Sequence, residues 1–441
     1  MRLKTRTLSD WLTWIEKLHP RSIELGLERV HAVLGNMELR RPHYAAITIS
    51  GTNGKGSATA MGEAILRRAG YKVGAYTSPH LIAYNERIRI NGQPVTDDEL
   101  CAAFERIEAA RGSVPLTYFE YGTIAAFDLF RAGAIDVAVL EVGMGGRLDA
   151  VNAIDADATI VTSVDIDHTS WLGDTREAIG REKAGIFRRG RPAICGDPDP
   201  PRIIAEEASR IGAQLLQINR DFFIERTATE WNWRYISPGR THAVGEDSSG
   251  MADQRFRVGL PYPALRGDYQ LFNAASMLMA LESLAGRFPV TQADVREGLL
   301  SAVIPGRFQV LPGRPIQVLD VAHNHQAARA LAATLRQQLV VGRTFAIFGM
   351  LKDKDLVSVA SAMAGAVDRW YPATLNVPRG ATAAQLMEAL TVAGANAPRR
   401  GYDDVLQAYA AACREATESD RIVVFGSFHT VGDILATSRK V

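Results

Sequence analysis

A glycine-rich loop between an apolar strand and a helix is the feature of this sequence best suited to chemistry. Residues 47–50 alternate in the β-branched manner of a strand, the loop over 51–57 reads GTNGKGS, and a helical pattern runs over 58–68. Glycines in such a loop let backbone N–H groups converge on a phosphate, and the helix N-terminus adds partial positive charge. Lys55 can then reach the outer phosphates of a nucleotide, and Ser57 can hold a Mg²⁺ ion.

The spacing of this loop departs from the common nucleotide-binding pattern, G-x-x-x-x-G-K-[ST]. Only residues 52 and 53 separate the first two glycines, and Gly56 stands between Lys55 and Ser57. Taken alone, the loop also fits a plain turn with an exposed lysine, because short glycine motifs recur by chance.

Polar side chains follow three other expected strands at their carboxyl ends, where open α/β sheets bind ligands. Ser78 follows the strand 71–76, Glu141 lies at the end of 135–142, and Asp165, Asp167 and His168 follow 158–164. A hydroxyl, a carboxylate and an imidazole there can ligate Mg²⁺, although this metal prefers oxygen. Each residue alone also fits a structural role, as a turn former, a loop charge or a hydrogen-bonding group.

The elements that must position these residues form an α/β pattern. Strand-like and helix-like runs alternate from residue 46 to about 216, which predicts a mostly parallel sheet covered on both faces. The expected strands are 71–76, 135–142, 158–164 and 192–195, and the expected helices are 100–110, 122–131, 177–187 and 203–211. Residues 222–262 read as hairpins with a mobile loop over 237–253, and helical patterns follow over 271–284 and 295–303.

A second α/β region begins near Pro305-Gly306. Its expected elements are strands 317–321, 345–348 and 421–425 and helices 327–339 and 356–366. We therefore expect one domain over 1–303, with a small β-hairpin region over about 222–262, and a second domain over 304–441.

The composition excludes several classes of protein. The 441 residues are 47% hydrophobic and 22% charged with a formal net charge of +1, so we expect neither nucleic-acid nor membrane binding. The cysteines, at 101, 195 and 413, match no zinc spacing, which fits a reducing cytoplasm. Asp10, Glu16 and Lys17 interrupt the apolar pattern near the N-terminus, so we expect no signal peptide.

The irregular loop resembles that of the ATP-dependent Mur ligase superfamily, in its folylpolyglutamate synthase/dihydrofolate synthase branch. Nearly the whole chain carries motifs similar to those of the bifunctional bacterial enzymes, in the same order. These are GTNGKGS at 51–57, SPHL at 78–81, LTYFEYG at 116–122, EVGMGGRLD at 141–149, DH at 167–168, WLG at 171–173, REKAGIF at 181–187, PGRFQ at 305–309, DVAHN at 320–324, GMLKDKD at 349–355 and GSFHT at 426–430.

The resemblance implies a P-loop-containing N-terminal Mur-ligase-like α/β domain and a smaller Rossmann-like C-terminal α/β domain that acts as the glutamate ligase domain. It also implies site residues. Those for ATP are Thr52, Asn53, Gly54, Lys55, Gly56, Ser57, Asn273, Arg307 and Asp320, with His323 close to the phosphates. Those for Mg²⁺ are Ser78, Glu141 and His168. Those for the pteroate or folate are Leu25, Gly26, Leu27, Thr117, Tyr118, Phe119, Glu120, Leu148, Asp149 and Ala150, and Ser427 is expected near the incoming glutamate.

Lys183 has a separate implied role. The family carries a lysine carbamylated by CO₂ (N6-carboxylysine) at this position, which turns a cation into an anion suited to a metal site. The sequence alone favours an exposed helical lysine, and the carbamylated lysine is the alternative that the resemblance implies.

The resemblance implies ATP-dependent ligation of L-glutamate to dihydropteroate, giving dihydrofolate, and to reduced folates such as tetrahydrofolate, giving polyglutamates. We expect an acyl-phosphate intermediate, ATP and Mg²⁺ as cofactors with a monovalent cation such as K⁺ as a further candidate, and a cytoplasmic monomer. One alternative is a muramyl-peptide ligase, disfavoured because only about 45 residues precede the loop strand. Another is a non-catalytic nucleotide-binding module on the same fold.

Two features depart from the family pattern. Asn324 is followed by His325, where a proline is usual, so we expect a slightly different turn after Asp320. The polar stretch 237–253 is longer than expected.

Overall fold

The computed structural model describes residues 6–21, 23–236 and 254–438. The polar stretch 237–253, expected to be a mobile loop, lies outside the described residues. The chain divides into two compact units: residues up to 78 with 85–264 and 270–303, and residues 79–84 with 265–269 and 304 onward. Among the described helices, none combines the length and the apolar character needed to cross a membrane.

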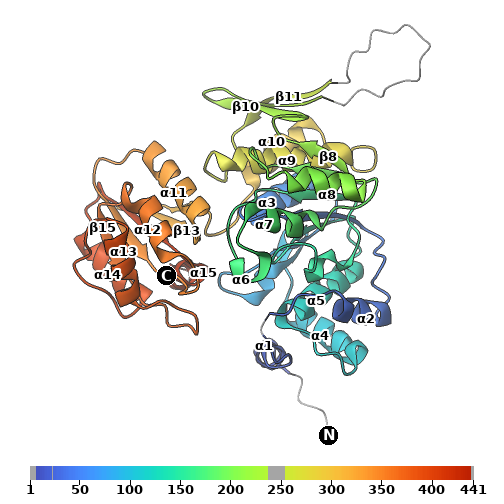
Figure 1. The fold of residues 1–441 in the computed structure, drawn as a ribbon, viewed down its shortest axis with the longest axis horizontal. Helices are drawn as coiled ribbons and strands as arrows, with labels where there is room; N and C mark the ends of the chain where they lie inside the picture. The colour runs from blue at the N-terminus through green and yellow to red at the C-terminus, as the bar shows by residue number, and fades with distance from the viewer. Residues whose placement is uncertain (1–5, 22, 237–253, 439–441) are drawn as a thin grey trace. The chain divides into compact units, whose positions relative to one another are not determined.

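The first unit is built on an eight-stranded sheet (Figure 1). The strand order is β4-β3-β2-β5-β1-β6-β7-β8, with parallel pairing from β2 through β8 and antiparallel pairing of β3 and β4. In that order the strands are Gln93–Pro94, Ile88–Ile90, Val73–Tyr76, Val137–Glu141, Ala45–Ser50, Ala158–Val161, Pro192–Cys195 and Gln214–Gln217. Every residue of β1 and β5 is buried, as expected for central strands covered on both faces.

Helices cover this sheet and one another. α3 packs on β1, β2 and β5 and carries α10 on its outer side, while α5 packs on β2 and against α4 and α2 (Figure 1). The helices of this unit are α1 (Leu8–Glu16), α2 (Glu28–Asn36), α3 (Lys55–Arg68), α4 (Asp97–Arg111), α5 (Tyr118–Ala132), α6 (Thr169–Leu172), α7 (Arg176–Ala184), α8 (Ile203–Ile211), α9 (Tyr269–Ser283) and α10 (Gln292–Ser301), with 3-10 turns η1 (Tyr84–Arg87) and η2 (Ala150–Ala153).

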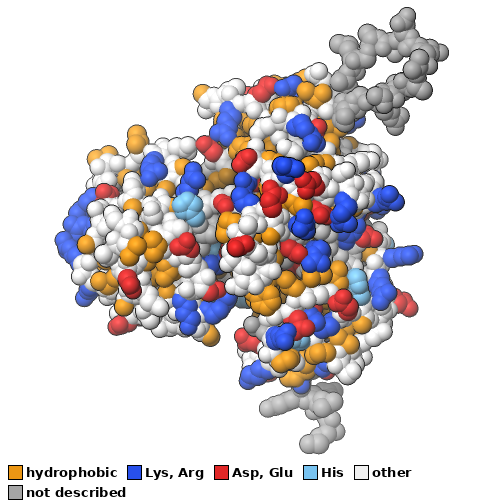
Figure 2. Space-filling model, in the orientation of Figure 1, with side chains coloured by type: hydrophobic (Ala, Val, Ile, Leu, Met, Phe, Trp, Pro, Cys, Tyr) orange, Lys and Arg blue, Asp and Glu red, His pale blue; other side chains and the backbone are white. Residues whose placement is uncertain are grey.

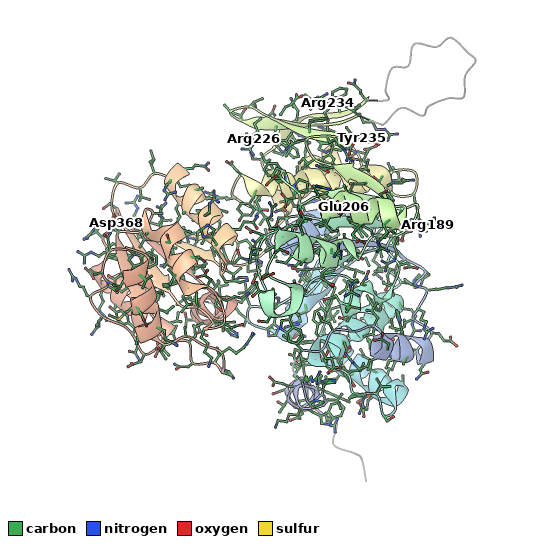
Figure 3. The ribbon with its side chains drawn as sticks, in the orientation of Figure 1. Arg189, Glu206, Arg226, Arg234, Tyr235 and Asp368 are labelled. Carbon is green, nitrogen blue, oxygen red and sulfur yellow. The ribbon has the colours of Figure 1, made fainter. Side chains whose placement is uncertain are left out.

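A small antiparallel sheet completes the first unit. Its order is β11-β10-β9, with β9 at Phe222–Arg226, β10 at Glu230–Ile236 and β11 at Gln254–Pro261, which confirms the expected hairpins. Trp231 and Trp233 of β10 are fully buried, while Arg226 and Arg234 project from the strands of this sheet (Figure 3).

The second unit has a five-stranded sheet of order β12-β13-β16-β14-β15, parallel except for β12. Successive residues of β14 pack into two different hydrophobic clusters, Phe345 and Ile347 into one and Ala346 and Phe348 into the other, so both faces of this sheet are covered. The strands are β12 (Gln309–Leu311), β13 (Ile316–Asp320), β14 (Thr344–Phe348), β15 (Arg369–Pro372) and β16 (Arg421–Phe425), and the helices are α11 (His325–Gln337), α12 (Leu356–Ala364), α13 (Ala383–Val392), α14 (Val405–Glu415) and α15 (Phe428–Ser438).

The α/β class with a mostly parallel first sheet is confirmed, while several boundaries and elements differ from the expectation. β6 ends at Val161, three residues before the expected end at Val164, because the next residues turn to hold the glycine loop. Some helices and strands were also not predicted from the sequence, namely α1, α2, α6, α13, α14, α15, β3, β4, β8, β12 and β15. Charged side chains of both signs are interspersed over the face in Figure 2, in keeping with the net charge of +1.

Candidate active site

The glycine loop leaves the carboxyl end of β1 and leads directly into the N-terminus of α3. Gly54 caps the helix with φ of 90°, a left-handed conformation that favours glycine. Among the described side chains, none caps α3 by hydrogen bonding. The first-turn N–H groups of this 14-residue helix are therefore placed to bind an anion such as a phosphate.

Reciprocal hydrogen bonds fasten this loop to the segment after β6. Thr52 Oγ1 accepts from the N–H of Asp165 at 2.9 Å and donates to its carbonyl at 3.0 Å. Thr162 Oγ1 donates to the Asn53 carbonyl at 2.6 Å, and the Asn53 N–H donates to Ser163 Oγ at 3.1 Å. The sequence analysis missed Thr162 and Ser163, whose signal is a pair of hydroxyl residues at a strand end.

The Lys55 side chain folds back over the loop. Its Nζ donates to the carbonyls of Gly51 at 2.9 Å and Thr52 at 3.3 Å. This holds the ammonium group beside the helix N-terminus, where the resemblance places the phosphates.

Asn273 of α9 lies directly against the loop. A Cβ built on Gly54 would stand 2.3 Å from Asn273 Oδ1. Asn273 Nδ2 donates to Gln270 Oε1 at 3.0 Å, and Gln270 Nε2 donates to Ser57 Oγ at 3.2 Å. Gln270 was missed by the sequence analysis, although its i, i+3 spacing from Asn273 puts both on one helix face.

Ser78 and Glu141 come together as expected from neighbouring strands. The N–H of Ser78 donates to Glu141 Oε2 at 3.2 Å, and Glu141 is only 4% exposed. β2 and β5 pair in parallel, so their carboxyl ends place a hydroxyl and a buried carboxylate side by side. These are oxygen ligands of the kind that Mg²⁺ prefers.

His168 lies in the loop after β6, seven residues beyond the strand end, and not directly at it. It adopts a left-handed conformation (φ 52°, ψ 39°) and begins α6, a strained geometry of the kind that clusters at functional sites. Within the described ranges, no three His, Cys, Asp or Glu side chains form a metal-binding group. The expected set of Ser78, Glu141 and His168 contains only two such side chains and stays a prediction.

Lys183 of α7 is buried, which favours the unusual reading over the exposed lysine. The residue is 3% exposed, and its pKa is lowered to about 7 by burial and by the charge of Lys55, against an opposing effect of Asp167. With its pKa lowered to about 7, this lysine is a neutral amine in about half of the molecules near pH 7, and the neutral amine is the form that reacts with CO₂.

Of the three segments assigned to the pteroate, residues 25–27 and 148–150 are in direct contact, and residues 117–120 contact Gly143, five residues before Leu148. The N–H of Gly26 donates to the Leu148 carbonyl at 3.2 Å, and the ring of Phe119 lies against Gly143. Asp149 is buried and accepts hydrogen bonds from the N–H groups of Met144 and Val151, and burial raises its pKa to about 7. Leu25, Leu27, Tyr118 and Leu148 are half-buried around this region, and Thr117, Glu120 and Ala150 are buried.

The second unit groups its own predicted residues at the carboxyl end of β13. Asp320 accepts from the N–H groups of Phe308 and Ala322 at 2.8 Å each, and burial raises its pKa, opposed by the charge of Arg307. The guanidinium of Arg307 and the ring of His323 both lie near Phe428, at 5.2 and 6.1 Å between centres.

Ser427 and Asn324, also in this unit, each have a defined hydrogen-bond partner. Ser427 follows β16, is buried, and accepts from the His429 N–H at 3.2 Å. Asn324 caps α11 by accepting from Ala327 N–H, so His325 takes the first helical position, where a proline is also well tolerated.

Comparison with known proteins matches both parts of the chain. Residues 49–275 match a family model described as the Mur ligase middle domain, and residues 306–428 match the Mur ligase, glutamate ligase domain. The chain is 43% identical over 428 residues to the dihydrofolate synthase/folylpolyglutamate synthase of Escherichia coli strain K12, covering 97% of this chain and 94% of that protein. It is 36% identical to the enzyme of the same name from Haemophilus influenzae, covering 99% of each.

Solved protein structures are also similar to this chain. The chain is similar to E. coli FolC in complex with DHPP and ADP, with a TM-score of 0.89, 42% identity and 99% of each chain covered. It is also similar to a bifunctional folylpolyglutamate synthase/dihydrofolate synthase with Mn, AMPPNP and L-glutamate bound, with a TM-score of 0.88, 42% identity and 99% and 98% coverage. The chain therefore belongs to the dihydrofolate synthase/folylpolyglutamate synthase family of Mur ligases.

Proposed function

We propose that this chain is an ATP-dependent ligase that joins L-glutamate to dihydropteroate, giving dihydrofolate, and to reduced folates, giving their polyglutamates. The γ-phosphoryl group of ATP passes to the substrate carboxylate, so that ADP leaves and an acyl phosphate forms. The glutamate α-amine attacks the acyl carbon, loses a proton and displaces phosphate. The observation that carries this reaction is the glycine loop at the N-terminus of α3, where Lys55 Nζ donates to the Gly51 carbonyl and the charge of Lys55 lowers the pKa of the buried Lys183.

Binding and charge stabilisation are the work of the protein in such a reaction. Lys55 and the first-turn N–H groups of α3 would bind the phosphates, with Asn273, Arg307 and Asp320 contacting ATP and His323 close to the phosphates. Ser78, Glu141 and His168 would hold a Mg²⁺ ion, which when bound neutralises phosphate charge.

Lys183 would act as its carbamate. The neutral amine of Lys183 adds to CO₂, forming a C–N bond and releasing one proton. The product replaces a cation that would be repelled by Lys55 and by Mg²⁺ with an anion that both attract. The buried position keeps this group out of bulk water.

The pteroate would bind among residues 25–27, 117–120 and 148–150. The Gly26–Leu148 hydrogen bond and the contact of Phe119 with Gly143 support this grouping. L-glutamate would approach Ser427, which follows β16. The relatives with DHPP and with L-glutamate bound support these substrate classes.

A product assay tests the proposal. Purified protein is incubated with ATP, Mg²⁺ and L-glutamate together with dihydropteroate or tetrahydrofolate, and products are identified by mass spectrometry. We expect ADP and phosphate release to require both glutamate and the pteroate or folate. Turnover with a muramyl peptide instead would support that alternative ligase, and no turnover with any acceptor would support the non-catalytic module.

We also infer a cytoplasmic monomer. None of the three cysteines forms a disulfide in the described residues, which suits a reducing compartment. A sedimentation mass near 48 kDa at micromolar concentration would support the monomer, and twice that mass would contradict it.

A further inference from the structure

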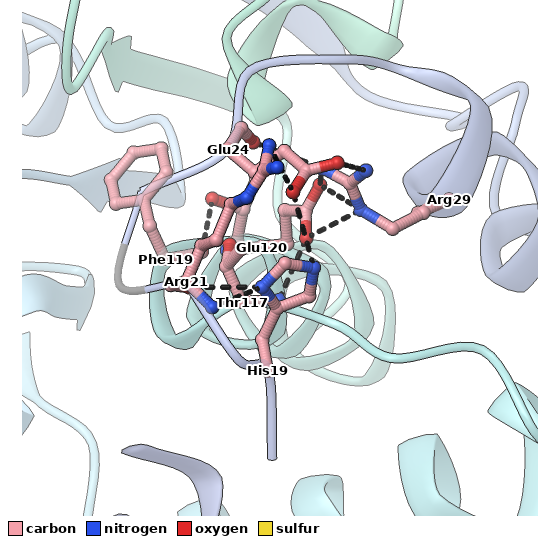
Figure 4. Close-up of polar contacts among 8 residues, drawn as sticks. His19, Arg21, Glu24, Arg29, Thr117, Phe119 and Glu120 are labelled. Atoms are coloured by element: carbon pink, nitrogen blue, oxygen red, sulfur yellow. Dashed lines mark hydrogen bonds and ion pairs between the residues drawn. The ribbon is translucent and has the colours of Figure 1, made fainter. Parts of the chain in front are cut away.

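A network of ion pairs joins the segment before α2 to the start of α5, next to the expected pteroate pocket (Figure 4). Arg29 lies at its centre. Its Nε and Nη2 donate to both carboxylate oxygens of Glu120, at distances from 2.8 to 3.2 Å. The same guanidinium donates to Glu24, through Nη1 to Oε1 at 3.0 Å and through Nη2 to the carbonyl at 2.9 Å.

Glu120 fixes one end of this network within α5. It is 3% exposed, and its Oε2 accepts from the Thr117 N–H at 2.7 Å in a capping box. A buried carboxylate of this kind is costly unless it is paired, and the fork of an arginine satisfies both oxygens at once. Burial lowers the pKa of Arg29, but the hydrogen bond and charge of Glu120 outweigh it, so the guanidinium stays charged.

Glu24 fixes the other end, in a segment without regular secondary structure. Residues 23–27 run as an extended loop into α2, which starts without a side-chain cap among the described residues. Arg29 holds the Glu24 backbone and side chain, and Leu148 holds Gly26 through its carbonyl. Contacts to Glu24 from His19, at 3.7 Å, and Arg21, at 3.5 Å, complete the cluster.

We propose that Arg29 is a positioning residue for the pteroate: by bridging Glu24 and Glu120, it holds residues 25–27 against residues 117–120 in the arrangement that receives the pterin ring. This inference rests on the proposed function. It adds a residue that would touch no substrate and act only through the two segments. The guanidinium is required, since one ammonium group cannot reach four acceptors on two different segments.

Arg131 offers a matched control. It also joins α5 to the chain around α2, because its Nη1 donates to the Met37 carbonyl at 2.8 Å and its Nη2 to Asp128 Oδ1 at 3.0 Å. Arg131 is near the C-terminus of α5, whereas Glu120 is in its first turn. An Arg131→Gln variant therefore weakens the contact between α5 and the end of α2 at a place distant from residues 25–27 and 117–120.

The experiment measures KM and kcat for dihydropteroate, KM for ATP and the melting temperature. For Arg29→Gln we expect a rise in the dihydropteroate KM of about tenfold or more, with the KM for ATP and the kcat within about threefold of wild type, because a disordered loop costs binding energy and not chemistry. Arg29→Lys should recover most of the melting temperature while its dihydropteroate KM stays raised. Arg131→Gln should leave that KM unchanged.

The Glu24→Ala variant tests the same bridge by removing the other partner of Arg29. Glu24 is partly exposed, so this variant should fold. We expect a smaller rise in KM, and the double variant with Arg29→Gln should be no worse than Arg29→Gln alone, since both act through one bridge.

The outcomes separate this inference from the proposed function. A wild type that makes no dihydrofolate overturns the function and the pteroate site with it. An active wild type whose dihydropteroate KM is unchanged in Arg29→Gln and Glu24→Ala overturns only the positioning role. So does an Arg29→Lys variant in which melting temperature and KM recover together.

Discussion

Gly54 and Asn273 are in such close contact that a single added carbon at Gly54 would stand 2.3 Å from the Asn273 amide oxygen. Gly54 also has a left-handed φ of 90°, so two independent constraints select glycine at the start of α3. Real Cβ atoms do not approach an oxygen this closely, so either the loop or α9 must move if a side chain is added. The loop that would hold the phosphates therefore depends on α9 for its shape.

Gly54→Ala should raise the KM for ATP by about tenfold or more, because the loop must shift to relieve the contact. Gly70→Ala is the matched control: Gly70 has a φ of 89°, but a Cβ there would meet nothing within 4 Å. In the control, backbone strain alone should lower the free energy of unfolding by about 1–2 kcal/mol, and the KM for ATP should stay unchanged. Equal ATP kinetics in the two variants would contradict the role assigned to the Gly54–Asn273 contact.

Lys55→Ala should lower kcat by about 10²- to 10³-fold with little change in melting temperature, because its ammonium group would stabilise charge on the transferring phosphoryl group. Lys72→Ala, which removes an exposed lysine of the same unit, should behave as wild type. Steady-state ADP release measures both. Near-normal ligation by Lys55→Ala would mean that the loop does not act on phosphate.

The sequence could predict the positions of strands and their polar ends because these depend on local patterns. Glu141, Ser78 and Lys55 follow the expected strands, and parallel pairing brings Ser78 and Glu141 together. It could not predict the partners of Arg29, because Glu120 lies 91 residues away and the bond depends on how α2 packs on α5. The burial of Lys183 was missed for the same reason: the sequence alone favoured an exposed lysine, because a helix pattern does not show what covers each face.

The end of β6 shows a different limit. The apolar pattern continues to Val164, but the strand stops at Val161, where the hydroxyls of Thr162 and Ser163 hydrogen-bond to Asn53. Propensity favours a longer strand, and tertiary hydrogen bonds override it.

Glu141→Gln should increase the Mg²⁺ concentration needed for half-maximal activity by about tenfold, because a neutral amide oxygen is a weaker ligand for a hard cation than a carboxylate. Glu206→Gln removes an exposed carboxylate of α8 (Figure 3) and should leave the Mg²⁺ dependence unchanged. Titration of activity with Mg²⁺ at saturating ATP gives the comparison. An unchanged midpoint in Glu141→Gln would place the metal elsewhere.

Lys183→Ala should lose most activity and regain part of it when formate or acetate is added, because a small carboxylate can fill the vacated space and supply the missing oxygens. Lys183→Arg should stay inactive with or without these acids, since arginine keeps its positive charge and cannot be carbamylated. Full activity in Lys183→Arg would refute any role at the metal site and leave a structural lysine as the explanation.

Carbamylation of Lys183 should depend on pH around neutrality. Its pKa is lowered from 10.5 to about 7, so the ammonium form prevails below about pH 7 and the reactive amine prevails above it. Because carbamate formation releases a proton, raising the pH from 6 to 8 should increase occupancy, and adding bicarbonate should move the midpoint to lower pH. Carbon NMR with ¹³C-bicarbonate measures the carbamate directly, with Lys183→Ala as the blank. An unmodified Lys183 across this range in active, Mg²⁺-bound enzyme would refute the carbamate, and a midpoint near 10 would show that burial does not lower the pKa of this amine.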